Sequence, residues 1–436
     1  MYLDVAKGWA KLIGSNAAAS LLQIGTLAIA ARALEIEALG MLILVQTWVR
    51  VVDGLLNFQS VNVLTRFLSE AEESGRDEWF AGLIKAGLII DLATAVLAMG
   101  VSIVGLFLVG SYFGLADEWL VAAIVYSLVI PTRLFGAAEA ALRCMGRFWM
   151  IGGRSTFHAL LVFCGTVSVW LLGGDVVDLL GVWIAGEIVA NLCFLGMTWS
   201  VLTHSSYDIA RSDARGAVAM SPNFWSQLWQ TNASLGVRML TQDGDVLIAG
   251  GLLGPAAASL LRAAKALSGA LGQLGWPLRQ VVSAPLSRFA SQRDFRSLRR
   301  MAMGVSVVGM VAGIIATAGF ALFSESIMRM VFGTEFVLAA FVAILLFGAR
   351  TLFLSGVPLM PVMLAIDLSG RFLGAVIAGT VAFAVVAALA LGPLGLVGLA
   401  LGHIAFEVVW LGYGWIATLR ELRKRESQFS PVQGPV

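Results

Sequence analysis

Five polar residues repeat at helical spacing in a segment that is otherwise apolar. Gln46, Arg50, Asp53, Asn57 and Ser60 lie three or four positions apart, so on one helix they would occupy an arc of roughly 80°. A cation within a helix bundle implies water, an anionic ligand, or both. Because ionised groups in a bilayer are costly, we expect this face to line a wet cavity. Asp53 can pair with Arg50, three positions away.

Two later segments carry the same kind of polar face. In residues 223–251 its members are Gln227, Thr231, Ser234, Arg238, Gln242 and Asp245. In residues 255–287 they are Arg262, Gln273, Gln280 and Ser283, with Lys265 beside them. Asp243 or Asp245 could pair with Arg238, whereas Arg262 and Lys265 have no carboxylate nearby in the sequence.

The three faces together predict a central aqueous cavity of positive character. The residues that we expect to bind substrate there are Gln46, Arg50, Asp53, Asn57, Arg238, Asp245, Arg262, Lys265 and Gln273. In the competing interpretation the faces are hydrogen-bonded contacts that only hold helices together.

Two further carboxylates are candidates for carrying a coupling proton. Glu139 and Glu187 lie in or near apolar segments, where burial favours proton uptake by a carboxylate near neutral pH. The alternative is that they pair with arginines such as Arg133 or Arg143. We expect no metal and no cofactor, because metal-ligand, nucleotide-binding and nucleophile motifs are missing from the sequence. An ion or proton gradient remains an available energy source.

Composition places these residues in a membrane protein. Of the 436 residues, 59% are hydrophobic and 13% are charged, against about 25% charged in a soluble domain. The sequence predicts an all-α polytopic protein with about twelve transmembrane helices. The predicted spans are residues 10–33, 38–64, 81–112, 119–143, 152–173, 178–202, 223–251, 255–287, 299–324, 335–364, 371–391 and 394–419. Pro358 and Pro361 predict a break in the tenth.

Charge and repetition predict the topology. Lysine and arginine gather in the even-numbered connections and at both ends, with Arg32 and Arg329 as exceptions, so we expect both termini in the cytoplasm. "LAIAARALEIEALG" resembles "VLIAGGLLGPAAAS", which indicates a parallel repeat of two six-helix halves. The predicted parts are an N-terminal bundle (1–205), a cytoplasmic linker (206–222), a C-terminal bundle (223–420) and a cytoplasmic tail (421–436).

Two stretches resemble the Wzx-type polysaccharide flippases of the multidrug/oligosaccharidyl-lipid/polysaccharide exporter superfamily. They are "ARALEIEALGMLILVQTWVRVVDGLLNFQSVNVLTRFLSEA" and "TQDGDVLIAGGLLGPAAASLLRAAKAL", in which Asp245 falls where the family often has an aspartate. "EIEALG" lacks the usual aromatic–glycine step, and "GPAAAS" lacks the usual tyrosine.

The resemblance implies a V of two six-helix bundles that works by alternating access. The implied cargo is a polyprenyl-pyrophosphate-linked oligosaccharide, moved from the cytoplasmic to the outer leaflet of the bacterial inner membrane for surface polysaccharide assembly. Implied partners are the lipid bilayer and polysaccharide polymerase machinery, and no nucleic acid. A cation-coupled multidrug or metabolite exporter of the same superfamily is the alternative. A membrane glycosyltransferase or polymerase is disfavoured, because the outer connections are too short for a catalytic domain.

Overall fold

The computed structural model describes residues 2–58, 60–115, 118–204, 207–273 and 275–429. Throughout this part the chain is helical and forms no β-strand, as expected where the backbone must satisfy its own hydrogen bonds in lipid. The predicted all-α polytopic fold is confirmed. Nine helices among the described residues are long and apolar enough to cross a bilayer. The count of twelve is not confirmed, because residues 10–33, 223–251 and 255–287 fall outside those nine.

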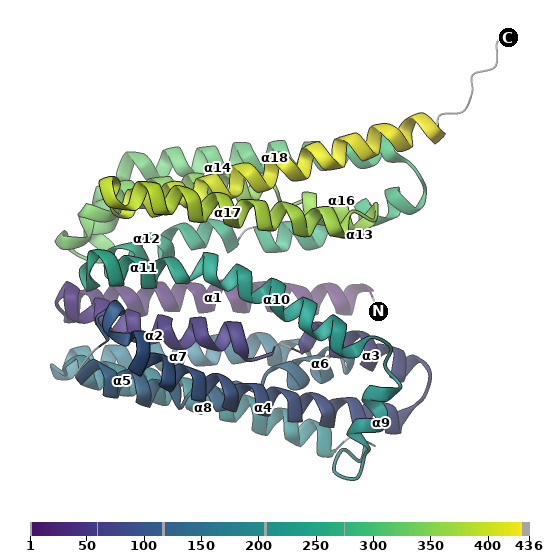
Figure 1. Cartoon of the computed structure of the whole chain (residues 1–436), viewed down its shortest axis with the longest axis horizontal. Helices are drawn as coiled ribbons and strands as arrows, with labels where there is room; N and C mark the ends of the chain where they lie inside the picture. The colour runs from purple at the N-terminus through teal and green to yellow at the C-terminus, as the bar shows by residue number, and fades with distance from the viewer. Residues whose placement is uncertain (1, 59, 116–117, 205–206, 274, 430–436) are drawn as a thin grey trace. The chain divides into compact units, whose positions relative to one another are not determined.

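The chain divides into two compact units, Met1–Ser259 and Leu260–Val436. In the first unit α1 packs along α7, α7 along α8, and α4 against α2 and α9 (Figure 1). Its elements are α1 (Tyr2–Ala33), α2 (Ile36–Leu56), α3 (Val61–Glu73), α4 (Asp77–Val109), η1 (Gly110–Phe113), α5 (Glu118–Ser127), η2 (Ile130–Thr132), α6 (Gly136–Cys144), α7 (Phe148–Leu172), α8 (Val176–Thr203), α9 (Ala214–Ala219), α10 (Phe224–Gln242) and α11 (Gly244–Leu253).

The second unit is built around a hairpin of two long helices, α17 and α18, with α14 and α15 packed together beside them. Its elements are α12 (Pro255–Gln273), whose first five residues belong to the first unit, α13 (Gly275–Ser291), α14 (Phe295–Val331), η3 (Thr334–Ala339), α15 (Ala340–Ser355), α16 (Leu359–Ala365), α17 (Ser369–Leu394) and α18 (Leu396–Phe429).

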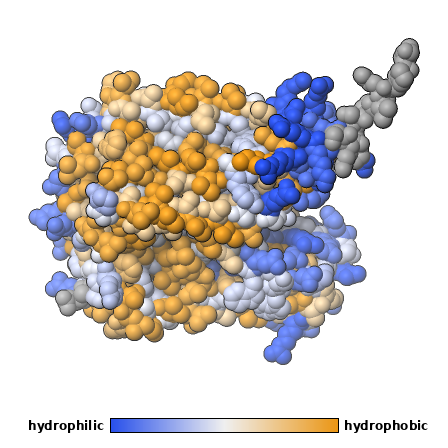
Figure 2. All heavy atoms as spheres, turned by 45° about the horizontal axis from the view of Figure 1, so that its top comes forward, coloured by the Kyte–Doolittle hydropathy of each residue, from blue (hydrophilic) through white to orange (hydrophobic). Residues whose placement is uncertain are grey.

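The outer helix faces are apolar, as a lipid environment requires. Large side chains such as Leu172 (86% exposed) and Leu322 (79%) lie on the surface, which is rare over a wide area in water-soluble proteins. Figure 2 shows hydrophobic residues along the sides of the helices and hydrophilic ones gathered near their ends. Both observations support a multi-pass membrane protein.

Several predicted spans are interrupted rather than continuous. The predicted helix 38–64 is wrong in this respect, because α2 ends at Leu56 and α3 begins at Val61. The span 119–143 consists of α5, η2 and α6, with Pro131 in the first turn of η2. The predicted break near Pro358 is confirmed, since α15 ends at Ser355 and Pro358 caps α16. Interrupted helices place backbone ends and polar groups inside a bundle, which is what the candidate site uses.

The compact units divide later in the chain than the predicted linker at 206–222. Helices α10 and α11 pack on α2, and Phe224 and Leu228 of α10 join the apolar cluster that contains Leu64 and Phe67 of α3. The predicted bundle boundaries and cytoplasmic tail remain a prediction.

Candidate functional site

Arg133 is the centre of a buried charge network in the first unit. It directly follows η2, and its side chain is 10% exposed. Nη1 donates to Asp53 Oδ2 of α2 at 2.8 Å, and Nε donates to Glu187 Oε1 of α8 at 2.7 Å. One guanidinium thus joins two carboxylates from helices far apart in sequence. A charge buried in this way is retained only where hydrogen-bonded partners offset its desolvation.

Amides and a phenol extend the network along α2. Gln46 Nε2 donates to Tyr126 Oη at 3.3 Å, and Tyr126 Oη donates to Glu187 Oε2 at 3.1 Å. Asn57, the residue that ends α2, donates through Nδ2 to Asp53 Oδ1 at 2.9 Å and to the Arg133 carbonyl at 3.3 Å. The end of α2 is therefore held by the carbonyl of Arg133, the residue that follows η2.

The predicted pair of Arg50 with Asp53 is wrong. Asp53 is engaged by Arg133 and Asn57, while Arg50 Nη1 lies 3.6 Å from Asp243 Oδ1, between α10 and α11. The side chains of Arg50 and Asp243 are 29% and 15% exposed, so this ion pair is longer and wetter than the Arg133 contacts. Asp53 does not pair with Arg50 because Arg133, from the segment that follows η2, gives it a shorter and more buried partner.

Both carboxylates predicted as candidates for proton coupling, Glu139 and Glu187, contact an arginine. Glu187 contacts Arg133 as described, and Glu139 of α6 lies 3.4 Å from Arg143 and 3.7 Å from Arg154. These contacts match the alternative in which Glu139 and Glu187 pair with arginines. A role in proton coupling stays a prediction.

A second buried carboxylate ties the interrupted helices together. Asp91 of α4 is fully buried, accepts from Ser60 Oγ at 2.7 Å and accepts from the Ala137 N–H at 2.8 Å. Ser60 precedes α3, and Ala137 lies in the first turn of α6, where an acceptor offsets an unpaired helix N–H. Asp91 thus satisfies the start of α6 while fixing α3.

The remaining predicted substrate residues are distributed over three helices. Arg238 is exposed on α10, and Asp245 is fully buried in the first turn of α11. Arg262 and Lys265 are half-buried on α12 in the second unit, and Gln273 at the end of α12 is exposed. The side chains of Ser234 and Gln280 lie outside the described residues.

Charge is distributed unequally between these regions. The network around α2 holds three carboxylates (Asp53, Glu187, Asp243) and two arginines. The segment 255–293, by contrast, contains no aspartate or glutamate. Its cations are Arg262, Lys265, Arg279, Arg288 and Arg293. The basic residues therefore concentrate in α12 and α13, whereas the polar face of α2 is close to charge balance.

Sequence reasoning gave Arg133 no central role and missed Tyr126 and Asp243 as partners. One signal was available for Arg133, because it follows Pro131 by two positions in a charge-poor span, and proline marks the interruption. Tyr126 carries no comparable signal, since a single tyrosine in an apolar helix is ordinary packing or an interface anchor.

The fold is that of known membrane transporters. An inward-facing multidrug resistance transporter of the MATE family, in the MOP superfamily, matches with a TM-score of 0.73 and 14% identity, over 96% of each chain. The lipid II flippase MurJ matches with a TM-score of 0.72 and 14% identity, over 95% of this chain and 90% of that one. The eukaryotic MATE transporter AtDTX14 matches with a TM-score of 0.66 and 15% identity, over 98% and 99%.

A relative is also found by sequence. The inner membrane protein YghQ of Escherichia coli (strain K12) is 21% identical over 342 residues, which span 77% of this chain and 94% of that protein. No model of a known protein family matches the chain. These three solved structures are transporters, and the relative carries the name of an inner membrane protein.

Proposed function

We propose that this protein is a flippase for a polyprenyl-pyrophosphate-linked oligosaccharide, which it moves from the cytoplasmic to the outer leaflet of the bacterial inner membrane. The observation that carries the proposal is the basic, carboxylate-free segment formed by α12 and α13. Arg262 and Lys265 are three positions apart on α12, both half-buried, and no aspartate or glutamate occurs from Pro255 to Arg293. Guanidinium and ammonium groups are the protein's usual ligands for phosphate.

The low hydropathy of these helices supports a polar role. Neither α12 nor α13 meets the length and hydropathy expected of a lipid-exposed span, although each is an ordinary helix of 19 and 17 residues. A helix at membrane depth with this composition must face protein, water or a polar cargo. The Arg50 side chain, 29% exposed and only loosely paired with Asp243, is a further phosphate donor in this proposal.

The family resemblance and the fold comparisons add independent support. MurJ, a lipid II flippase, shares the fold over 95% of this chain. By analogy we propose that this chain also transports an anionic lipid-linked cargo, whose tail stays in the bilayer. The polar groups of α2, such as Gln46 and Asn57, would then contact the sugars.

The test is translocation by the purified full chain in proteoliposomes that contain a fluorescent polyprenyl-diphosphate oligosaccharide. The change in the fraction of probe that a membrane-impermeant quencher reaches measures transport. The variant Arg262→Gln/Lys265→Gln is expected to lose translocation without losing helicity. Arg211→Gln is the matched control, because its side chain is 91% exposed. Wild-type transport by the double variant would refute phosphate recognition by α12.

A second candidate function is favoured by the charges around α2. Three carboxylates against two arginines suit a cation-coupled exporter of drugs or metabolites better than a purely anionic cargo. In that case Glu187 or Glu139 would exchange a proton with the gradient. Efflux of an organic cation that follows an imposed pH gradient, and is lost in Glu187→Gln, would favour the exporter over the flippase.

A further inference from the structure

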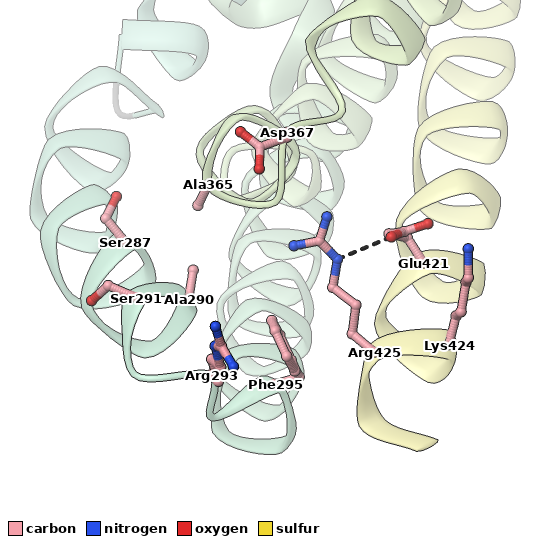
Figure 3. Close-up of a pocket in the computed structure, with 10 residues that line it drawn as sticks. All are labelled: Ser287, Ala290, Ser291, Arg293, Phe295, Ala365, Asp367, Glu421, Lys424 and Arg425. Carbon is pink, nitrogen blue, oxygen red and sulfur yellow. Dashed lines mark hydrogen bonds and ion pairs between the residues drawn. The ribbon is translucent and has the colours of Figure 1, made fainter. Parts of the chain in front are cut away.

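The second unit contains a pocket of about 590 Å³ at the ends of α13, α16 and α18. This volume fits a small ligand or a lipid head group. The pocket is remote in sequence from Arg262 and Lys265, and it belongs to neither the charge network of the first unit nor the polar face of α12. Its lining residues, drawn in Figure 3, are Ser287, Ala290, Ser291, Arg293, Phe295, Ala365, Asp367, Glu421, Lys424 and Arg425.

One cation in the pocket is held in a fixed orientation. Arg425 donates from Nε to Glu421 Oε1 at 2.9 Å and from Nη2 to the Ile366 carbonyl at 2.9 Å. Its guanidinium also lies 5.9 Å from the centre of the Phe295 ring. These contacts use part of the fork of N–H donors, and Arg425 lines the pocket. Glu421 is thereby occupied in orienting Arg425. A preorganised guanidinium loses little entropy when it binds phosphate.

Cations and a carboxylate line different sides of the pocket. Figure 3 draws Asp367 at the top, Arg293 at the base, and Arg425 and Lys424 along a third side. Asp367 is exposed, and its carboxylate makes no ion pair within the described part of the chain. The hydroxyl of Ser291 is used locally, because it donates to the Arg288 carbonyl at 2.9 Å. The pocket therefore offers phosphate ligands and one acceptor for a positive group.

The backbone at two lining residues is unusual. Arg293 (φ 58°) and Asp367 (φ 61°) are left-handed, a conformation found at three non-glycine residues of the described chain. Arg293 is the left-handed residue that ends α13, and after it the Asp294 N–H is bonded to the Phe289 carbonyl at 3.0 Å. Glycine usually occupies this position in a helix C-terminal cap. Asp367 ends α16 in the same way, with the Leu368 N–H bonded to the Met363 carbonyl at 2.7 Å, so two helix ends with left-handed residues line one pocket.

We propose that this pocket binds a molecule that carries both a phosphate ester and an amine, the chemistry of a phosphoethanolamine head group. Arg293, Lys424 and Arg425 contact the phosphate, and Asp367 contacts the ammonium. Such a group comes from a membrane lipid or from a soluble phosphoamine. The lining suits this zwitterion better than a plain anion, because Asp367 would repel additional negative charge.

The test measures binding to the purified full chain in detergent by isothermal titration. Its probes are dihexanoyl phosphatidylethanolamine, dihexanoyl phosphatidylglycerol, soluble phosphoethanolamine and inorganic phosphate. We expect the ethanolamine lipid to bind more tightly than the glycerol lipid. Equal binding of soluble phosphoethanolamine would support the same chemistry with a soluble source, and tighter binding of the lipid would assign the source to the membrane.

Three variants separate the contacts. Asp367→Asn, which keeps a residue tolerant of left-handed backbone, is expected to abolish the preference for ethanolamine. Arg293→Gly relieves the backbone and removes the cation, so it is expected to weaken both lipids about tenfold, the loss of one charge-assisted hydrogen bond, without lowering the unfolding temperature. Arg296→Gln, an exposed arginine outside the pocket lining, controls for general loss of charge.

Two results would overturn the proposal. The first is an unchanged preference for the ethanolamine lipid in Asp367→Asn. The second is wild-type affinity in Arg293→Gly, or binding that falls as much in Arg296→Gln as in the pocket variants.

Discussion

The two units interrupt comparable helices but fill the interruptions with different chemistry. In the first unit the η2 interruption between α5 and α6 is held by Arg133, Asp53 and Glu187. In the second unit the interruption between α15 and α16 lies in an apolar cluster of Leu271, Leu354 and Val357. Directional, charged contacts fix one arrangement, whereas apolar packing tolerates sliding. The contrast indicates that charged contacts hold the first interruption, whereas mainly apolar packing holds the second.

The largest effect is expected from Arg133→Leu. Removing the cation leaves Asp53 and Glu187 buried without their main partner, which costs about 3–5 kcal/mol. The midpoint of thermal unfolding in detergent should fall steeply. Arg133→Leu/Asp53→Asn/Glu187→Gln, which removes all three charges, should regain most of the loss. A single variant as stable as wild type would show that the network stabilises nothing.

A smaller and chemically different loss is expected from Leu354→Ala in the second unit. Leu354 is 3% exposed, so truncation leaves a cavity that costs about 2–4 kcal/mol. Because no charge is involved, the loss of unfolding free energy should be the same at low and high salt, and the same at any pH between about 6 and 8. A strong dependence on salt or pH would contradict the assignment of this interruption to apolar packing.

Two glycines provide a matched comparison of the units. A Cβ at Gly136 would lie within 2.7 Å of both carboxylate oxygens of Asp91, whereas one at Gly269 on α12 meets nothing within 4 Å. Gly136→Ala should therefore cost about 1–3 kcal/mol, and Gly269→Ala should be neutral or stabilise by up to about 1 kcal/mol. Chemical unfolding of both variants measures the difference. Equal effects would mean that α12 is as tightly packed as the start of α6.

The smallest effect on stability is expected from Arg50→Gln. Its ion pair with Asp243 is 3.6 Å long and partly solvated, so its loss should cost below about 1 kcal/mol. Transport in the proteoliposome assay should nevertheless fall, if Arg50 contacts the phosphates of the cargo. If Arg50→Gln retains full transport and unchanged stability, Arg50 does not bind the cargo and only contributes to helix packing.

The sequence predicted the fold class and one helix break correctly, for clear physical reasons. Apolar runs of membrane length report burial in lipid directly, and Pro358 cannot continue a helix. The end of α2 carried no such mark, because "NFQS" lacks proline and glycine. That end is set by Asn57, which bonds the Arg133 carbonyl 76 residues away.

The partners of the charged residues could not be predicted from the sequence either, because they too come from segments distant along the chain. Helical spacing made Asp53 the natural partner of Arg50, yet each pairs with a residue from a distant segment, Arg133 and Asp243. A one-dimensional pattern gives the face on which a charge lies. It does not give the segment that the tertiary fold brings against that face.

The pair of Arg50 and Asp243 has a consequence for how the protein is made. About 190 residues separate the two, which a ribosome takes about 10–40 s to add at about 5–20 residues per second. Throughout that interval Arg50 of α2 lacks the aspartate that it finally contacts. During biosynthesis Arg50 must therefore rely on a temporary partner, which Asp53, water or the phosphate groups of surrounding lipids can provide.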